Sequence, residues 1–259
     1  MQNSVEQYKA NFKTALVFAL LLVFVPAFAS FPNIFISSGS LFIDYNVLSA
    51  SPAMLLAEAG LTALFLLFYS FFLSIIIFSV RKGLSKLKLQ IYLHEMIQKF
   101  ALRVFAFYIL FCLLAFLFVS ILLLLGIHML LATPVLLIAA FLLMFVPQAV
   151  VIDEEGLRHA LSTNFDFLLK HPLDFFKIAV IGAVLLALLQ LLEFGLAQLT
   201  LLAPYISLLL CLVFILPFLE VMKTYLYLMK IDLIKHHEIA RKKKPLPPRV
   251  EPEDLASAK

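Results

Sequence analysis

Apolar residues fill six long stretches of the chain, and shorter polar or basic segments separate them. The stretches cover about residues 14–31, 53–80, 104–126, 130–152, 177–202 and 204–229. A helix of about 20 apolar residues crosses the hydrocarbon core of a bilayer. The pattern therefore predicts an all-α fold, a polytopic membrane helix bundle with six transmembrane helices.

Two of the segments between these stretches are amphipathic. Residues 153–176 carry apolar side chains three or four positions apart, opposite a charged side: Leu157, Leu161, Phe165, Leu168, Pro172 and Phe175. Residues 81–103 repeat the design with Leu89, Leu93, Met96, Ile97 and Phe100. This spacing is typical of helices that lie in the membrane interface. We predict two interfacial helices on the cytoplasmic side and a repeated unit of spanning helix, surface helix and spanning helix.

The positive charges support one orientation of this bundle. With six spans, all 20 Lys and Arg residues fall on the same side, and the connections at 31–52, 127–129 and 203 contain none. Basic connections face the cytoplasm in membrane proteins. Both termini are therefore expected inside, which requires an even number of spans.

The positions of the basic residues also divide the chain. Residues 1–230 form one predicted membrane domain, and residues 231–259 form a basic, Pro-rich cytoplasmic tail. A cation next to the membrane gains about 1 kcal/mol from anionic lipid, and this position favours lipid over nucleic acid as the partner. The predicted headgroup contacts are Arg81, Lys82, Lys86, Arg241, Lys242, Lys243 and Lys244.

The first apolar stretch has a second interpretation. Ala27-Phe28-Ala29 has the small-x-small form of a signal-peptidase site after a basic start and an apolar run. The length of the stretch favours an uncleaved first helix, and cleavage stays open as the alternative. The loop over 31–52 contains the turn formers Ser37 to Ser40, and we expect it to lie back on the bundle.

Composition agrees with the membrane class. Hydrophobic residues make up 64% of the chain and charged residues 14%, and the mean hydropathy is +1.06, against about 45–50% and about 25% in soluble proteins. No run alternates polar and apolar residues, which argues against a transmembrane barrel. Cys112 and Cys211 lie inside apolar stretches, where we expect packing residues and no disulfide.

Ionisable residues inside a membrane are costly, so they are the first candidates for function. The candidates are Glu58, Gln190, Glu193, Glu220 and Lys223. Glu58 and Glu193 could serve a proton or cation route, although hydrogen bonding near a wet interface is the simpler account. Glu220 and Lys223 have the spacing of an i,i+3 ion pair. Small residues along the fifth stretch predict that this helix is central in the bundle.

Catalytic motifs are incomplete in this sequence. His94-Glu95 begins a zinc-protease pattern, but Gln98 stands where the second histidine is needed. We therefore expect no metal and no cofactor, and a non-enzymatic role is favoured while enzymatic activity stays open. Prolines 26, 134, 147, 204 and 217 lie in or beside the spans, where a proline can kink a helix. Such kinks can serve helix packing, which we favour, or gating around a substrate site.

A loose motif carries a family resemblance. It consists of Phe145 to Asp153, Gly156, Ala160-Leu161-Ser162, Lys170 to Phe176, Pro217 and Tyr225-Leu226-Tyr227. In these residues the chain resembles the poorly characterised six-helix family that includes the membrane domain of some bacterial glycerophosphodiester phosphodiesterases. The resemblance implies the six-helix topology and a prokaryotic cytoplasmic membrane. It does not imply phosphodiesterase activity, because the soluble barrel that bears those catalytic carboxylates is missing from this chain.

Two hypotheses for function follow. The first is a non-enzymatic accessory or assembly factor that contacts membrane lipids and a membrane-protein partner or a second copy of itself. The alternative is a small transporter or channel that uses Glu58 and Glu193. An intramembrane enzyme ranks third.

Overall fold

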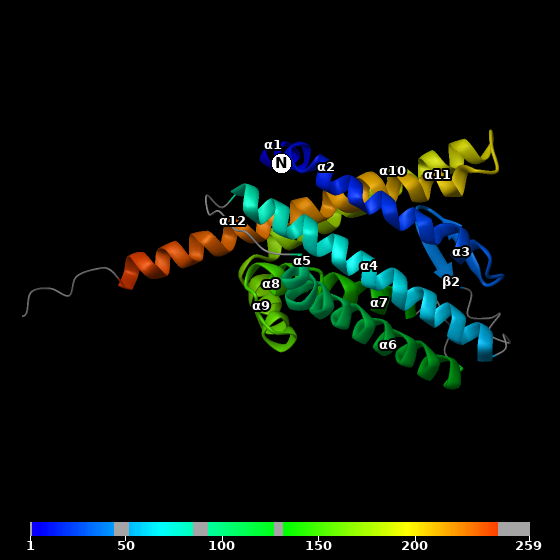
Figure 1. Cartoon of the computed structure of the whole chain (residues 1–259), viewed down its shortest axis with the longest axis horizontal. Coiled ribbons are helices and arrows are strands. Elements are labelled where there is room, and N and C mark those ends of the chain that lie inside the picture. Colours follow the sequence, from blue (N-terminus) through cyan, green and yellow to red (C-terminus); the bar gives the residue numbers. More distant parts are fainter. Residues whose placement is uncertain (1, 44–51, 85–92, 127–131, 243–259) are drawn as a thin grey trace, which may run out of the picture.

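The computed structural model describes residues 2–43, 52–84, 93–126 and 132–242, with side chains up to Lys230 in the last helix. It is predominantly helical (Figure 1). The helices are α1 (Gln2–Ala10), α2 (Phe12–Ala15), η1 (Leu16–Phe24), α3 (Val25–Ala29), α4 (Pro52–Leu84), α5 (Leu93–Met96), η3 (Ile97–Ala101), α6 (Leu102–Leu124), α7 (Ala132–Leu142), α8 (Val146–Ile152), α9 (Leu157–Lys170), α10 (Pro172–Ala197), α11 (Ala203–Leu210), η5 (Cys211–Ile215) and α12 (Leu216–Lys242). Here η1 is a 3-10 helix, whereas η3 and η5 are π-helical.

Six helical segments in the described residues are long and apolar enough to cross a membrane, as the hydropathy pattern predicts. They are Phe12–Ala29, Pro52–Gly83, His94–Leu124, Ala132–Ile152, Pro172–Ala197 and Ala203–Lys230. The chain is therefore a multi-pass membrane protein. The cytoplasmic position of its termini stays a prediction.

The loop after the first span contains a β-hairpin, which the all-α prediction missed. Strands β1 (Ile34–Ser37) and β2 (Ser40–Ile43) pair antiparallel, with Ser37 opposite Ser40. Ser38 and Gly39 both have positive φ, at 50° and 71°, as a two-residue hairpin turn with a right-handed twist requires. We call the end of the bundle that carries these strands the hairpin end, and the opposite end the basic end.

The hairpin tip fits closely into the helices, as expected for a loop that lies back on the bundle. A Cβ atom at Gly39 would lie 2.7 Å from Cys211 Cβ. The Gly39 N–H donates to Ser207 Oγ at 3.2 Å. Only a glycine with positive φ fits in this position without displacing its neighbours.

The predicted interfacial helix over 81–103 differs from the structure at both ends. Residues 81–84 complete α4, and residues 93–101 run directly into α6; residues 85–92 lie outside the described part. Met96 and Phe100 are buried in the main core. Their apolar face therefore packs on protein, because the start of the third span lies beside α4.

The second amphipathic segment does form a separate helix, α9. It buries Ala160, Asn164 and Phe167 and packs on α8. Phe165 and Leu169 are exposed, at 43% and 78%. The prediction of a helix within 153–176 is thus correct in position, and its contact with the membrane interface remains a prediction.

Helix α10 is peripheral, so the prediction that the fifth span is central is wrong. Only 17% of its apolar window is buried, against 50% for the span that ends in α12. Ala183, Ala187 and Gln190 are exposed, whereas Phe175, Ile178 and Leu189 face the protein. Small residues allow close packing, but here Ala183 and Ala187 are exposed, and of the small residues Gly182 lies near Leu219 of α12.

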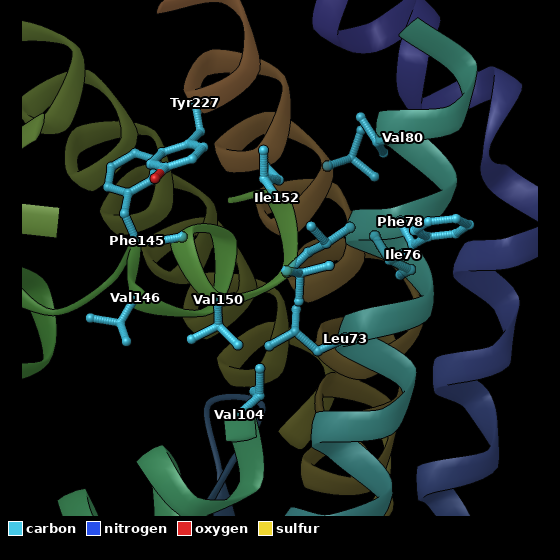
Figure 2. Close-up of a cluster of buried hydrophobic side chains, with 14 of the residues drawn as sticks. Leu73, Ile76, Phe78, Val80, Val104, Phe145, Val146, Val150, Ile152 and Tyr227 are labelled. Carbon is cyan, nitrogen blue, oxygen red and sulfur yellow. The ribbon is translucent and has the colours of Figure 1, made fainter. Parts of the chain in front are cut away.

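The core instead centres on the short helix α8. Every residue of α8 is buried, including Pro147 and Gln148. Figure 2 shows Val146, Val150 and Ile152 of α8 among side chains of α4, α6 and α12. The Phe145 ring lies 4.8 Å from that of Phe167 and 6.0 Å from that of Tyr227, centroid to centroid. Four helices therefore depend on this one element for their packing.

Basic side chains bind the carboxyl end of α8. Arg81 donates to the Val151 carbonyl at 3.2 Å and forms an ion pair with Glu154 at 3.2 Å. Lys99 lies 2.8 Å from the same carboxylate. Arg103 donates to the Glu154 and Glu155 carbonyls at 3.3 and 3.2 Å. Residues of α4, η3 and α6 thus fix the turn that connects α8 to α9.

We expect the ion pairs of Glu154 with Arg81 and Lys99 to weaken in acid. The hydrogen bond from Lys99, supported by Arg81, holds the pKa of Glu154 below its ordinary value of 4.5. The folded pKa is depressed, so the carboxylate stabilises the fold above its ordinary pKa, and this contribution is lost as pH falls through the folded value. Glu154→Gln should lower the melting temperature in detergent at pH 7, and the difference from wild type should vanish as the pH falls well below 4. Glu6→Gln, at an exposed position, is the matched control and should show no such trend.

Candidate functional site

The strongest candidate site is a buried ion pair in the last span. Glu220 Oε1 lies 2.6 Å from Lys223 Nζ, and the two residues are only 5% and 9% exposed. The predicted i,i+3 pair is therefore confirmed. It lies inside the bundle and not at its surface.

Two further groups complete this cluster. Gln148 Nε2 donates to Glu220 Oε2 at 3.0 Å, and Lys223 Nζ donates to the Met144 carbonyl at 3.3 Å. Both partners come from the interrupted fourth span. The ion pair thus joins α12 to the junction between α7 and α8, and its net charge is zero.

The fourth span breaks at this place for a local reason. Pro147 has no N–H to continue the helical hydrogen bonds, and α7 ends at Leu142 while α8 begins at Val146. Asn164 caps the break from α9: its Nδ2 donates to the Leu142 carbonyl at 2.8 Å and its Oδ1 accepts from the Phe145 N–H at 3.1 Å. Buried groups of this kind cost about 1–3 kcal/mol each when they have no partner.

The last span is also irregular next to the ion pair. The π-helical segment η5 ends at Ile215, just before Pro217 and one turn before Glu220. Segments of π-helix inside longer helices are often found at functional sites. Two irregular helices therefore meet at one buried pair of charges.

A pocket of about 180 Å³ lies beside this pair. The aromatic side chains Phe107, Tyr108 and Phe111 of α6 and Tyr69 of α4 line it, together with Ala140 of α7. The Tyr69 and Tyr108 rings meet edge to face with centroids 5.3 Å apart. Glu220 and Lys223 form its polar wall. At this volume the pocket can hold part of a mostly apolar molecule that has one polar group.

The two acids at the hairpin end hold the hairpin. Glu193 Oε2 accepts a 2.7 Å hydrogen bond from the Ser38 N–H and another from the Ser207 hydroxyl, and Ser37 Oγ lies 3.5 Å from Oε1. Glu58 is buried and accepts a 3.0 Å hydrogen bond from Asn33 Nδ2. The structure does not bring these acids to the Glu220 pocket, and Gln190 is exposed on α10.

The predicted headgroup contacts lie at the basic end or outside the described residues. Arg81 is engaged by Glu154 and Val151, and Lys82 is exposed. Arg241 and Lys242 end α12, with backbone but no side chain described. Lys86, Lys243 and Lys244 lie outside the described residues.

Sequence reasoning missed the two buried amides of the site. Gln148 lies within the family motif, and Asn164 lies on the apolar side of a helix that the sequence pattern assigns to the membrane surface. Their signal was present: an amide directly after a proline inside an apolar span, and an asparagine on a packed helix face. Among the described residues, no group of three or more His, Cys, Asp or Glu side chains could hold a metal ion.

The ion pair allows a test by paired substitution. Glu220→Leu alone should destabilise the protein by about 3–5 kcal/mol, because it leaves a buried ammonium without its partner. Glu220→Leu combined with Lys223→Leu should cost less than Glu220→Leu alone, since no buried charge remains. Unfolding in a denaturing detergent would measure both. Additive losses would contradict a coupled, buried pair.

Comparison with known proteins identifies no relative, so the function of this chain is argued from the geometry of the site. The chain matches no protein-family model, no curated protein and no solved structure. The resemblance to the six-helix family therefore stays a prediction. What can be stated of the chain is its class, a multi-pass membrane protein with a buried ion pair next to a pocket.

Proposed function

We propose that this chain is a non-enzymatic accessory or assembly factor of a membrane, and that it binds lipid in the pocket beside Glu220 and Lys223. The observation that carries the proposal is the composition of the pocket wall. Most of the lining side chains are aromatic or aliphatic, and their polar groups are one neutral ion pair and the hydroxyls of Tyr69 and Tyr108. An amphipathic molecule matches both.

The position of the pocket favours a ligand from the bilayer. Ala140, on its wall, is exposed at the protein surface, and the neighbouring Leu137 and Leu110 are 68% and 45% exposed. Inside a membrane these faces of α6 and α7 meet lipid tails. A lipid can therefore enter from the side without passing through water.

The basic end supports the same proposal. Contacts of the basic residues with anionic headgroups would fix the depth of the protein in the bilayer. By the positive-inside rule this end is cytoplasmic, and we propose the cytoplasmic membrane of a prokaryote as the location. The exposed face of α10 is the proposed place for a membrane-protein partner or for a second copy of the chain.

Filling the pocket should remove the bound lipid. In Ala140→Phe the new ring occupies the space beside Glu220, so lipid that co-purifies with the protein should fall to the background level. The measurement is native mass spectrometry after mild extraction, with the melting temperature as a check on folding. Ala187→Phe is the matched control, because it makes the same change on the exposed face of α10. Equal lipid occupancy in all three proteins would contradict the proposal.

A transporter or channel is the second candidate. One observation favours it: both helices that meet at the ion pair are irregular there, as in transporters whose broken helices surround a substrate site. The geometry favours Glu220 and Lys223 for this role over Glu58 and Glu193, which hold the hairpin.

A flux measurement separates the two candidates. We expect liposomes with the wild-type protein to show no proton or solute flux above empty liposomes. A flux that Glu220→Gln removes and Glu193→Gln retains would overturn the accessory role in favour of transport through the pocket. A flux that is lost in Glu193→Gln would instead favour a transport route along Glu58 and Glu193 at the hairpin end.

A further inference from the structure

Asn33 and Glu58 meet at the hairpin end, and each keeps one buried oxygen atom without a donor. Asn33 lies between α3 and β1, and Glu58 lies in the second turn of α4. They are 1% and 6% exposed. Asn33 Nδ2 donates to Glu58 Oε2, whereas Asn33 Oδ1 and Glu58 Oε1 have no hydrogen-bond partner among the residues that the structure describes. With Glu58 ionised, both atoms are acceptors, so a hydrogen-bond donor or a cation would complete them.

A cation as the partner would also balance the charge of the Glu58 carboxylate. No ion pair in the described part of the chain includes Glu58, and the sequence has no Lys, Arg or His between residues 14 and 80. A buried carboxylate without a counter-charge is unfavourable. A water molecule could fill the hydrogen bonds, but it would leave this charge uncompensated.

Glu193, the other described acid at this end, accepts more hydrogen bonds than Glu58. Glu193 accepts hydrogen bonds from Ser38 and Ser207, with Ser37 at the limit of hydrogen-bond distance. Glu58 has Asn33 alone. The two carboxylates hold the same hairpin, one at its start and one at its tip. Of these two described acids, Glu58 is the one with an oxygen atom that lacks a partner.

We infer that Asn33 and Glu58 form a binding site for a monovalent metal cation, with Asn33 Oδ1 and Glu58 Oε1 as protein ligands. Carboxylate and amide oxygens are hard ligands, which suit alkali and alkaline-earth ions better than zinc or copper. One carboxylate balances one positive charge, so Na⁺ leaves the site neutral. A Ca²⁺ ion normally takes more carboxylates.

Such an ion would join two parts of the fold. It would tie the first turns of α4 to the segment that leads into β1. Since a ligand that binds only the folded state stabilises it, the cation would raise the stability of the hairpin end. The site is separate from the Glu220 pocket, so its test does not depend on lipid binding.

The test is a thermal melt of the purified full chain in detergent. Sodium chloride replaces choline chloride stepwise at constant ionic strength and pH. The wild-type melting temperature should rise by about 5 °C once Na⁺ is well above its Kd. The rise should be linear in Na⁺ concentration below the Kd and logarithmic above it. Glu58→Gln should lose this response. Glu193→Gln, the matched removal of a carboxylate at the same end, should keep it.

A second variant covers the case in which Glu58→Gln does not fold. Asn33→Asp adds a carboxylate to the site, so it should gain stabilisation by Ca²⁺ that the wild type lacks. An absent Na⁺ response in the wild type, or an equal one in Glu58→Gln, would overturn the inference in favour of water. A response to pH alone would identify a bound proton and overturn the metal site. Failure of Asn33→Asp to respond to Ca²⁺ would count against Asn33 as a ligand.

Discussion

The backbone ends of a short buried helix impose the main constraint on this structure. Helix α8 has seven residues, all buried, and its ends lie where no lipid tail could hydrogen-bond them. Asn164 satisfies the break before it, and Lys223 binds the Met144 carbonyl. Arg81 and Arg103 bind carbonyls at its other end. The polar groups around α8 are therefore placed where the interrupted backbone needs hydrogen-bond partners.

The same constraint explains why the ion pair can exist. A lone ammonium would be very unfavourable in the bundle, but Lys223 neutralises Glu220 and also satisfies a free carbonyl. Gln148 adds a hydrogen bond to the carboxylate. The polar wall that results is neutral and lies against aromatic side chains. This cluster can therefore have a structural and a functional role at once, because Lys223 binds a free carbonyl at the helix break and also lines the pocket.

The two ends of the bundle use different polar chemistry. At the basic end, arginines and lysines bind backbone carbonyls and the carboxylates of Glu154 and Asp174. At the hairpin end, carboxylates hold a small β-hairpin through serine and asparagine donors, and the sequence supplies no cation there. This difference leads to the separate proposals for the two ends, lipid at the pocket and a cation at Glu58.

The sequence by itself determined the membrane class, the six spans and the i,i+3 pairing of Glu220 with Lys223, because hydropathy and helical spacing are local properties. Only the tertiary structure decided which faces are buried. It moved α10 to the periphery, joined residues 93–103 to the third span and turned α9 toward α8. In a membrane protein, hydropathy does not indicate which face is buried, since a lipid-facing side chain and a core side chain are equally apolar. The partners of Gln148 and Asn164 lie 72 and about 20 residues away, so no local pattern could have predicted them.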